Sequence, residues 1–117
     1  MNLEVIDKGD YLHFKLIGSF DVGTTKRVIR HIKEKHDEIN ADKAVIDFTH
    51  LEVIKISDTD RFYLGKEVPL NISNNVKLAS VAPAGVVNHF SETVAQNRGA
   101  NLKIFTEMEE AVVWLLS

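Results

Sequence analysis

Two hydroxyl side chains stand among charged residues in the stretch Lys55-Ile56-Ser57-Asp58-Thr59-Asp60-Arg61. The hydroxyls of Ser57 and Thr59 could each accept a phosphoryl group, which adds nearly two negative charges at neutral pH. Ser57 also fits the N-cap of a helix, a role that stabilises by about 0.5–2 kcal/mol. A phosphate there gains about 0.3–1 kcal/mol per charge from the helix dipole, but Asp58 and Asp60 repel it by roughly 0.7 kcal/mol each in water. The residues predict an N-cap at Ser57 and leave Ser57 and Thr59 as candidate phospho-acceptors.

Signatures of enzymes and metal sites are missing from the sequence. There is no glycine-rich phosphate loop, no G-x-S-x-G and no cysteine nucleophile. His31 and His36 are five residues apart, which places them on different faces of a helix, and no H-E-x-x-H motif accompanies them. Ser, His and Asp are frequent enough that a triad assembled by the fold stays open as an alternative. We expect no catalytic residues, no metal and no cofactor.

Length and composition limit the class of protein. With 117 residues the chain is the size of one domain, and we expect residues 1–117 to form a single unit. The formal charge is -3 and the basic residues are scattered, which argues against nucleic acid as a partner. No apolar stretch approaches the roughly 20 residues that span a bilayer, and the N-terminal residues lack the pattern of a signal peptide. Cysteine is absent, so a reducing compartment is the simplest assumption. We expect a cytoplasmic protein without stable membrane insertion.

Strand and helix patterns alternate along the chain. Residues 3–7 and 11–18 flank the turn Lys8-Gly9-Asp10, which predicts an antiparallel hairpin. A helix with a charged outer face follows, and then a short β-branched strand at 43–48. The second half predicts, in order, a helix from Ser57 that ends before Pro69, a strand at 76–83, a helical stripe over 86–95 that stops at Gly99, a strand at 102–105 and a last helix opened by the capping box Thr106-x-x-Glu109.

This order, β-β-α-β-α-β-α-β-α, predicts an α/β fold with a mostly parallel sheet of about five strands and about four helices. Loops that follow parallel strands gather at one edge of the sheet, where ligands bind. We therefore expect the loops 19–24, 49–60 and 83–89 to be neighbours. Asp21 and Asp47 each fit a role in capping or closing a turn from strand to helix. The candidate face for a partner or ligand consists of Asp21, Lys55, Asp58, Asp60, Arg61, Asn88 and His89.

Two motifs resemble the STAS family, the SpoIIAA-like anti-sigma-factor antagonists. Gly18-Ser19-Phe20-Asp21 is similar to the family's G-x-L-D, and residues 44–49, AVIDFT, are similar to its V-x-L-D-L-S. The chain then continues without a gap to Ser57, at the position of the antagonists' phosphorylated serine, although Lys55-Ile56-Ser57-Asp58 replaces their D-S-[ST]-G. The resemblance implies a SpoIIAA-like fold and a non-catalytic regulatory module whose partner is another protein.

An alternative function comes from residues 62–72, FYLGKEVPLNI. This apolar segment is interrupted by Gly65 and Pro69, so we expect a short helix followed by extended chain that closes over an apolar crevice. The segments 60–66, 88–105 and 109–115 resemble a divergent bacterial STAS-like branch often grouped with CRAL-TRIO lipid-binding domains, which implies a small apolar ligand. Ordinary packing of the helix against the sheet explains the same pattern. The candidate lid residues are Phe62, Tyr63, Leu64 and Leu70. The hairpin edge could in addition form a homodimer.

Overall fold

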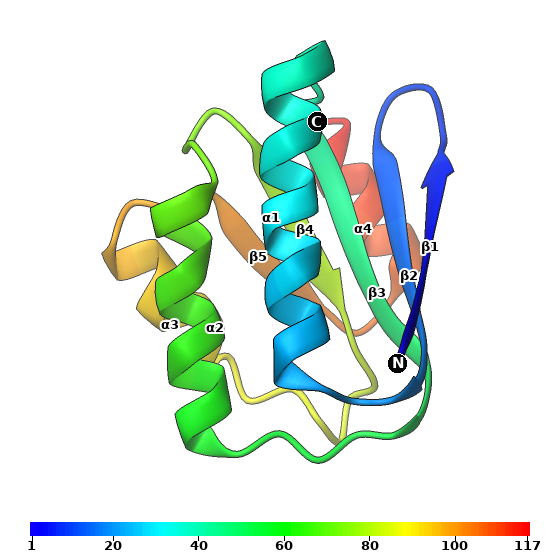
Figure 1. Ribbon diagram of the computed structural model, residues 1–117, viewed down its shortest axis with the longest axis vertical. Coiled ribbons are helices and arrows are strands. Elements are labelled where there is room, and N and C mark those ends of the chain that lie inside the picture. The colour runs from blue at the N-terminus through cyan, green and yellow to red at the C-terminus, as the bar shows by residue number, and fades with distance from the viewer.

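The computed structural model describes all residues 1–117 and contains one five-stranded sheet with four helices. The elements are β1 (Asn2–Asp7), β2 (Leu12–Ser19), α1 (Val22–Ile39), β3 (Lys43–Val53), α2 (Asp58–Asn71), β4 (Lys77–Val81), α3 (Phe90–Asn97), β5 (Leu102–Phe105) and α4 (Met108–Leu115). The strands lie in the order β1-β2-β3-β4-β5, with β1 antiparallel to β2 and the other pairs parallel (Figure 1). The α/β class, the hairpin and the element order are as predicted. None of the helices is long and apolar enough to cross a membrane.

The two faces of the sheet are covered unequally. Helices α1, α2 and α3 cover one face and α4 covers the other (Figure 1). Because side chains alternate along a strand, β3 sends Ile46 into the larger core and Val45 into the smaller one. Fully buried side chains such as Phe14 and Leu115 each contribute about 1.5–3 kcal/mol to folding. The sheet therefore holds two separate cores, one on each side.

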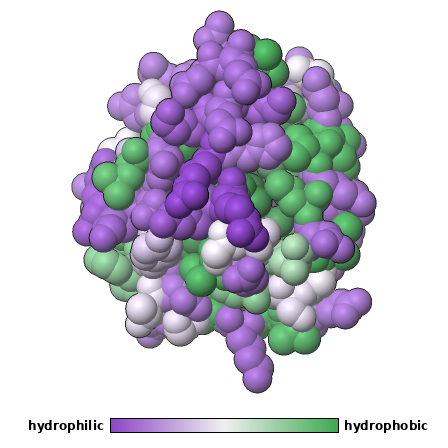
Figure 2. Space-filling model, in the orientation of Figure 1, coloured by the Kyte–Doolittle hydropathy of each residue, from purple (hydrophilic) through white to green (hydrophobic).

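Helix α1 begins and ends at polar residues. Asp21 is its N-cap, and Asn40 ends it in the left-handed conformation with φ 56°. The side of α1 that faces the sheet is buried and includes Val28, Ile29 and Ile32, whereas its outer side carries charged residues. The most hydrophilic part of the molecular face shown in Figure 2 therefore lies over α1. The helix therefore follows the periodicity of its sequence.

Strand β3 is longer than predicted. Its pairing with β2 continues past residue 48, with Gly18 beside Leu51 and Ser19 beside Val53, and the strand extends to Val53. Asp47 consequently lies inside the strand, and the expectation that it closes a turn into a helix is wrong. Long-range pairing with β2 extends the strand through residues 49–53, which we expected to belong to a loop.

The prediction that α2 ends before Pro69 is also wrong, because the helix continues to Asn71 with Pro69 in its last turn. Proline has no N–H to donate to the carbonyl four residues earlier. The turn is held by other bonds: Ile72 N donates to Val68 O at 2.8 Å, and Asn71 Nδ2 donates to Glu67 O at 2.8 Å. The expected extended segment within residues 62–72 is therefore mostly helix.

The last two helices begin later than predicted. Val86 N donates to Pro83 O in a turn, and α3 starts only at Phe90, so residues 86 and 87 are not part of the helix. Helix α4 starts at Met108 with Glu107 as its N-cap and no side-chain capping bond, so the predicted capping box is not formed. Thr106 stands one residue too early to cap this helix.

Candidate functional site

Three loops meet at the edge of the sheet where the parallel strands end. They follow β2, β3 and β4 and lie together at the bottom of Figure 1. Phe20 N donates to Val53 O at 2.8 Å, which joins the first loop to the end of β3. Residues 54–57, the start of α2 and residues 85 and 86 line one open depression of about 520 Å³. The edge therefore brings together segments from three distant parts of the chain.

Ser57 caps α2. Its Oγ accepts a hydrogen bond from Asp60 N at 3.0 Å, which confirms the predicted N-cap. Ser57, Asp58 and Thr59 are exposed, whereas Asp60 is half-buried. The first turn of α2 thus presents two hydroxyls and a carboxylate to solvent, next to the exposed Lys55. Acidic groups at a helix N-terminus are favoured by the helix dipole.

Asp21 is the N-cap of α1. Its carboxylate accepts from Thr24 Oγ1 at 2.7 Å and from Gly23 N at 3.1 Å. The bond from Thr24 is the largest of the effects that hold the pKa of Asp21 below its ordinary value. Arg27 Nη2 in turn donates to Thr24 Oγ1 at 2.8 Å. Asp21 is exposed at the edge, with its carboxylate engaged in capping.

The loop before α3 contributes Asn88 and His89. His89 has φ 61°, a left-handed conformation uncommon outside glycine, and its Nδ1 lies 3.1 Å from Glu92 Oε1. Asn88 Oδ1 accepts from Phe90 N at 3.0 Å. The other carboxylate oxygen of Glu92 accepts a hydrogen bond from Ile104 N on β5. Both candidate residues are exposed and are held in place by local hydrogen bonds.

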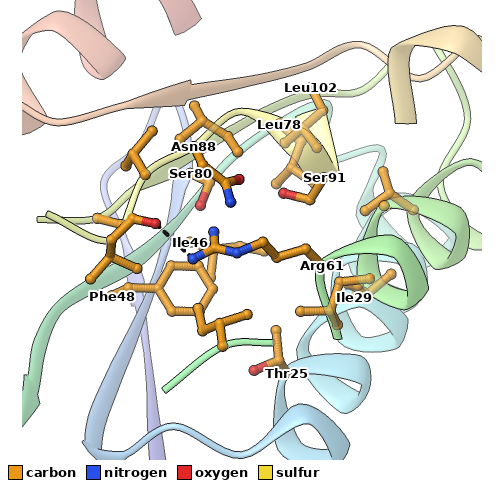
Figure 3. Close-up of a pocket in the computed structure, with 18 residues that line it drawn as sticks. Thr25, Ile29, Ile46, Phe48, Arg61, Leu78, Ser80, Asn88, Ser91 and Leu102 are labelled. Carbon is orange, nitrogen blue, oxygen red and sulfur yellow. Dashed lines mark hydrogen bonds between the residues drawn. The ribbon is translucent and has the colours of Figure 1, made fainter. Parts of the chain in front are cut away.

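Arg61 points inward rather than outward. Its side chain extends across a cavity beneath α2, where Nη2 donates to Val86 O at 2.8 Å (Figure 3). The cavity has a volume of about 80 Å³, and 12 of its 18 lining residues are hydrophobic. The chain therefore contains a small apolar cavity next to the candidate partner face.

The four candidate lid residues have different surroundings. Leu64 lines the cavity. Phe62 lies on the outside of α2 with the Arg98 guanidinium 5.5 Å from its ring, and Lys26 Nζ lies 5.1 Å from the Tyr63 ring. Leu70 is 68% exposed. Only Leu64 of this set faces the cavity.

One polar cluster was missed in the sequence. Asp47 is 1% exposed, and its Oδ2 lies 2.9 Å from His13 Nε2 and 3.3 Å from His50 Nε2. Its Oδ1 accepts from Thr49 N at 2.9 Å and from Thr49 Oγ1 at 2.6 Å. Burial acts most strongly and raises the pKa of Asp47, but the bonds from Thr49 and His13 together outweigh it, so the pKa lies below its ordinary value. The alternation of β3 puts Asp47 on the face opposite Ile46, a signal that could have indicated this cluster.

Comparison with known proteins rests on structure, because no family model and no curated protein matches the sequence. An uncharacterised protein of the DUF3478 family from Shewanella loihica, described as having a SpoIIAA-like fold, superposes with a TM-score of 0.57 at 19% identity, covering 97% of this chain and 92% of that one. A serine-to-glutamate variant of RsbS from Moorella thermoacetica superposes with a TM-score of 0.60 at 13% identity, covering 99% of this chain and 96% of that one. The chain therefore has the SpoIIAA-like fold that its two motifs indicated.

Proposed function

We propose that the chain is a non-catalytic, cytoplasmic regulatory module that binds another protein through the start of α2 and the adjoining loops. We call this surface the α2 rim; it comprises residues 54–60 and 85–89. The observation that carries the proposal is the meeting of the loops after β3 and β4 around one open depression, with Ser57, Asp58 and Thr59 exposed on a helix start. The SpoIIAA-like fold and the resemblance of its motifs to the STAS antagonists support the same function.

Charge narrows the kind of partner. Asp58 and Asp60 stand in the first turn of α2, and Asp58 is exposed. Complementary charge speeds association and selects partners, so a basic patch on the partner fits this rim. Ser57 and Thr59 remain candidate phospho-acceptors, since both are exposed. A phosphate would make the rim still more acidic and strengthen its attraction to such a patch.

Affinity capture with a matched pair of charge reversals tests this function. Asp58→Lys reverses a charge in the first turn of α2, and Glu109→Lys makes the same change in the first turn of α4, on the opposite face of the sheet. We expect wild type and Glu109→Lys to capture the same protein from lysate of the native host under kinase conditions, and Asp58→Lys to lose it. Quantitative mass spectrometry of the captured proteins gives the measurement.

The same spectra report whether phosphate is present on Ser57 or Thr59. Retention of the partner by Asp58→Lys, or its loss from both variants, would remove the α2 rim as the binding surface. A partner that binds without phosphate on either hydroxyl would make the interaction independent of phosphorylation.

A further inference from the structure

The cavity beneath α2 combines apolar walls with a single charged group. Its walls come from three helices and the sheet, and include Ile29 of α1, Phe48 of β3 and Leu78 of β4 (Figure 3). Arg61 is the only charged residue among the 18 that line it. An apolar space with one fixed charge favours an occupant that is apolar with a single opposite charge.

The charge of Arg61 has no partner within the protein. No carboxylate lies within 4.0 Å of its guanidinium, although other ion pairs of the chain do form. Its one hydrogen bond goes to a neutral carbonyl, Val86 O. Arg61 is half-buried, and a partly desolvated cation without a counterion costs free energy that an anion would recover. The guanidinium also offers further N–H donors in a planar fork that suits a carboxylate.

Polar groups surround the same end of the cavity. Figure 3 shows Ser80, Ser91 and Asn88 on one side of the Arg61 side chain and the Phe48 ring on the other. The hydroxyls of Ser80 and Ser91 make no hydrogen bond within the chain, and neither is fully shielded from solvent. They are available to donate to an acidic headgroup. The polar lining groups thus gather on one side of Arg61, and the rest of the lining is mostly apolar.

Size and charge decide between possible ligands. A volume of about 80 Å³ is roughly half of the 150 Å³ that holds a benzene ring in an engineered protein cavity. A long acyl chain exceeds this space, so only a tail of a few carbons can enter it. A phosphate would bring nearly two negative charges to one guanidinium, whereas a carboxylate brings one. We propose that this cavity binds a small monocarboxylic acid with a short apolar tail, its carboxylate paired with Arg61.

This site goes beyond the proposed partner surface and does not depend on it. Residues 56 and 86–88 of the α2 rim also line the cavity, but the exposed Ser57, Asp58 and Thr59, which the capture experiment concerns, do not. A ligand test on the isolated chain can therefore succeed or fail independently of protein capture.

Titration with isovalerate, followed by ¹H–¹⁵N NMR, tests the proposal. We expect saturable shifts of the backbone amides of Gly65 and Ser91, which line the cavity. Acetate has the charge without the tail, and isovaleramide has the tail without the charge. Each should bind at least about tenfold more weakly than isovalerate, because acetate loses the apolar contact and isovaleramide loses the ion pair with Arg61.

Two variants and one control locate the ligand. Arg61→Gln should weaken isovalerate binding about tenfold or more. Ser80→Val, which fills part of the cavity and removes a donor, should weaken it as well. Arg98→Gln is the matched control, because Arg98 also donates to a backbone carbonyl, Val94 O, but lies outside the cavity. It should leave the affinity unchanged.

Several results would overturn the proposal. They are the absence of saturable binding of isovalerate to the wild type, equal binding of isovaleramide, and unchanged binding after Arg61→Gln. Should Arg61→Gln fail to fold, the comparison of isovalerate with isovaleramide on the wild type and the Ser80→Val variant still decides the question.

Discussion

At the scale of single residues, Asp47 is the one charged side chain that the fold buries. It is 1% exposed and has both carboxylate oxygens occupied, by Thr49 on one side and by His13 and His50 on the other. A buried carboxylate with these bonds is stabilising only while its partners are present. The cluster joins β2 to β3 on the side of the sheet that α4 covers.

Asp47→Asn should destabilise the fold by about 1.5–3 kcal/mol near neutral pH, since the bonds to a charged acceptor are lost. Because the pKa of Asp47 in the folded protein lies below its unfolded value of 3.8, the ionised carboxylate stabilises the fold at every pH above 3.8. This stabilisation is lost as the pH falls through the lower, folded pKa. The difference in unfolding free energy between wild type and Asp47→Asn should therefore become smaller only in strong acid. Urea unfolding over a pH series measures it.

The exposed Asp42, just before the same strand, supplies the control. Asp42→Asn should change the unfolding free energy by less than about 0.5 kcal/mol. Equal stability of Asp47→Asn and wild type at neutral pH would contradict the assigned role of the buried carboxylate.

At the scale of elements, α2 is positioned by its contact with α3. Gly65 lies so close to α3 that an added Cβ would stand 2.6 Å from Ser91 O and 2.9 Å from Val94 Cβ. The backbone of α3 blocks this space, and it cannot move aside as a flexible side chain could. The close approach of α2 and α3 also closes one side of the cavity that Arg61 enters.

Gly65→Ala should destabilise the protein by about 1–3 kcal/mol through overpacking, although alanine favours helix. Gly23→Ala in α1 is the matched control, because its nearest contact, Asp21 Oδ1 at 3.5 Å, is ordinary. That variant should be neutral or more stable by up to about 1 kcal/mol. Thermal and urea unfolding of both variants provide the comparison, and a stabilised Gly65→Ala would disprove the tight contact.

At the scale of the whole molecule, a sheet with two apolar faces needs a cover on each. Three helices provide it on one side, and α4 alone provides it on the other, over Val45, Ala79 and Val81. In the smaller core, α4 contributes only two fully buried side chains, those of Ala111 and Leu115. Leu115 is 0% exposed in this core, whereas its neighbour Leu116 is 47% exposed.

Leu115→Ala should cost about 2–5 kcal/mol, as expected for a buried leucine that leaves a cavity. Leu116→Ala removes the same atoms from a largely solvated position and should cost less than about 1 kcal/mol. Urea unfolding of the pair measures the difference. Similar losses for both variants would mean that α4 does not anchor the second face as described.

The sequence alone was sufficient for the features that short stretches control. The hairpin, the helical stripe of α1, the Ser57 cap and the alternation of strands with helices all follow from contacts between residues near each other in the chain. The same alternation forces a parallel sheet, and with it the meeting of three loops at one edge. These features are as predicted because local periodicity and capping carry their own signal.

Only the tertiary structure decided the features that distant partners control. Asp47 is buried because β2, 34 residues earlier, brings His13 against it, and Arg61 turns inward because Val86, 25 residues later, offers a carbonyl. Helix α2 runs through Pro69, and β3 runs past Phe48, because packing and strand pairing outweigh local preference. The cavity is likewise a space left between elements, and its volume is set by how three helices rest on the sheet, which no short stretch of sequence encodes.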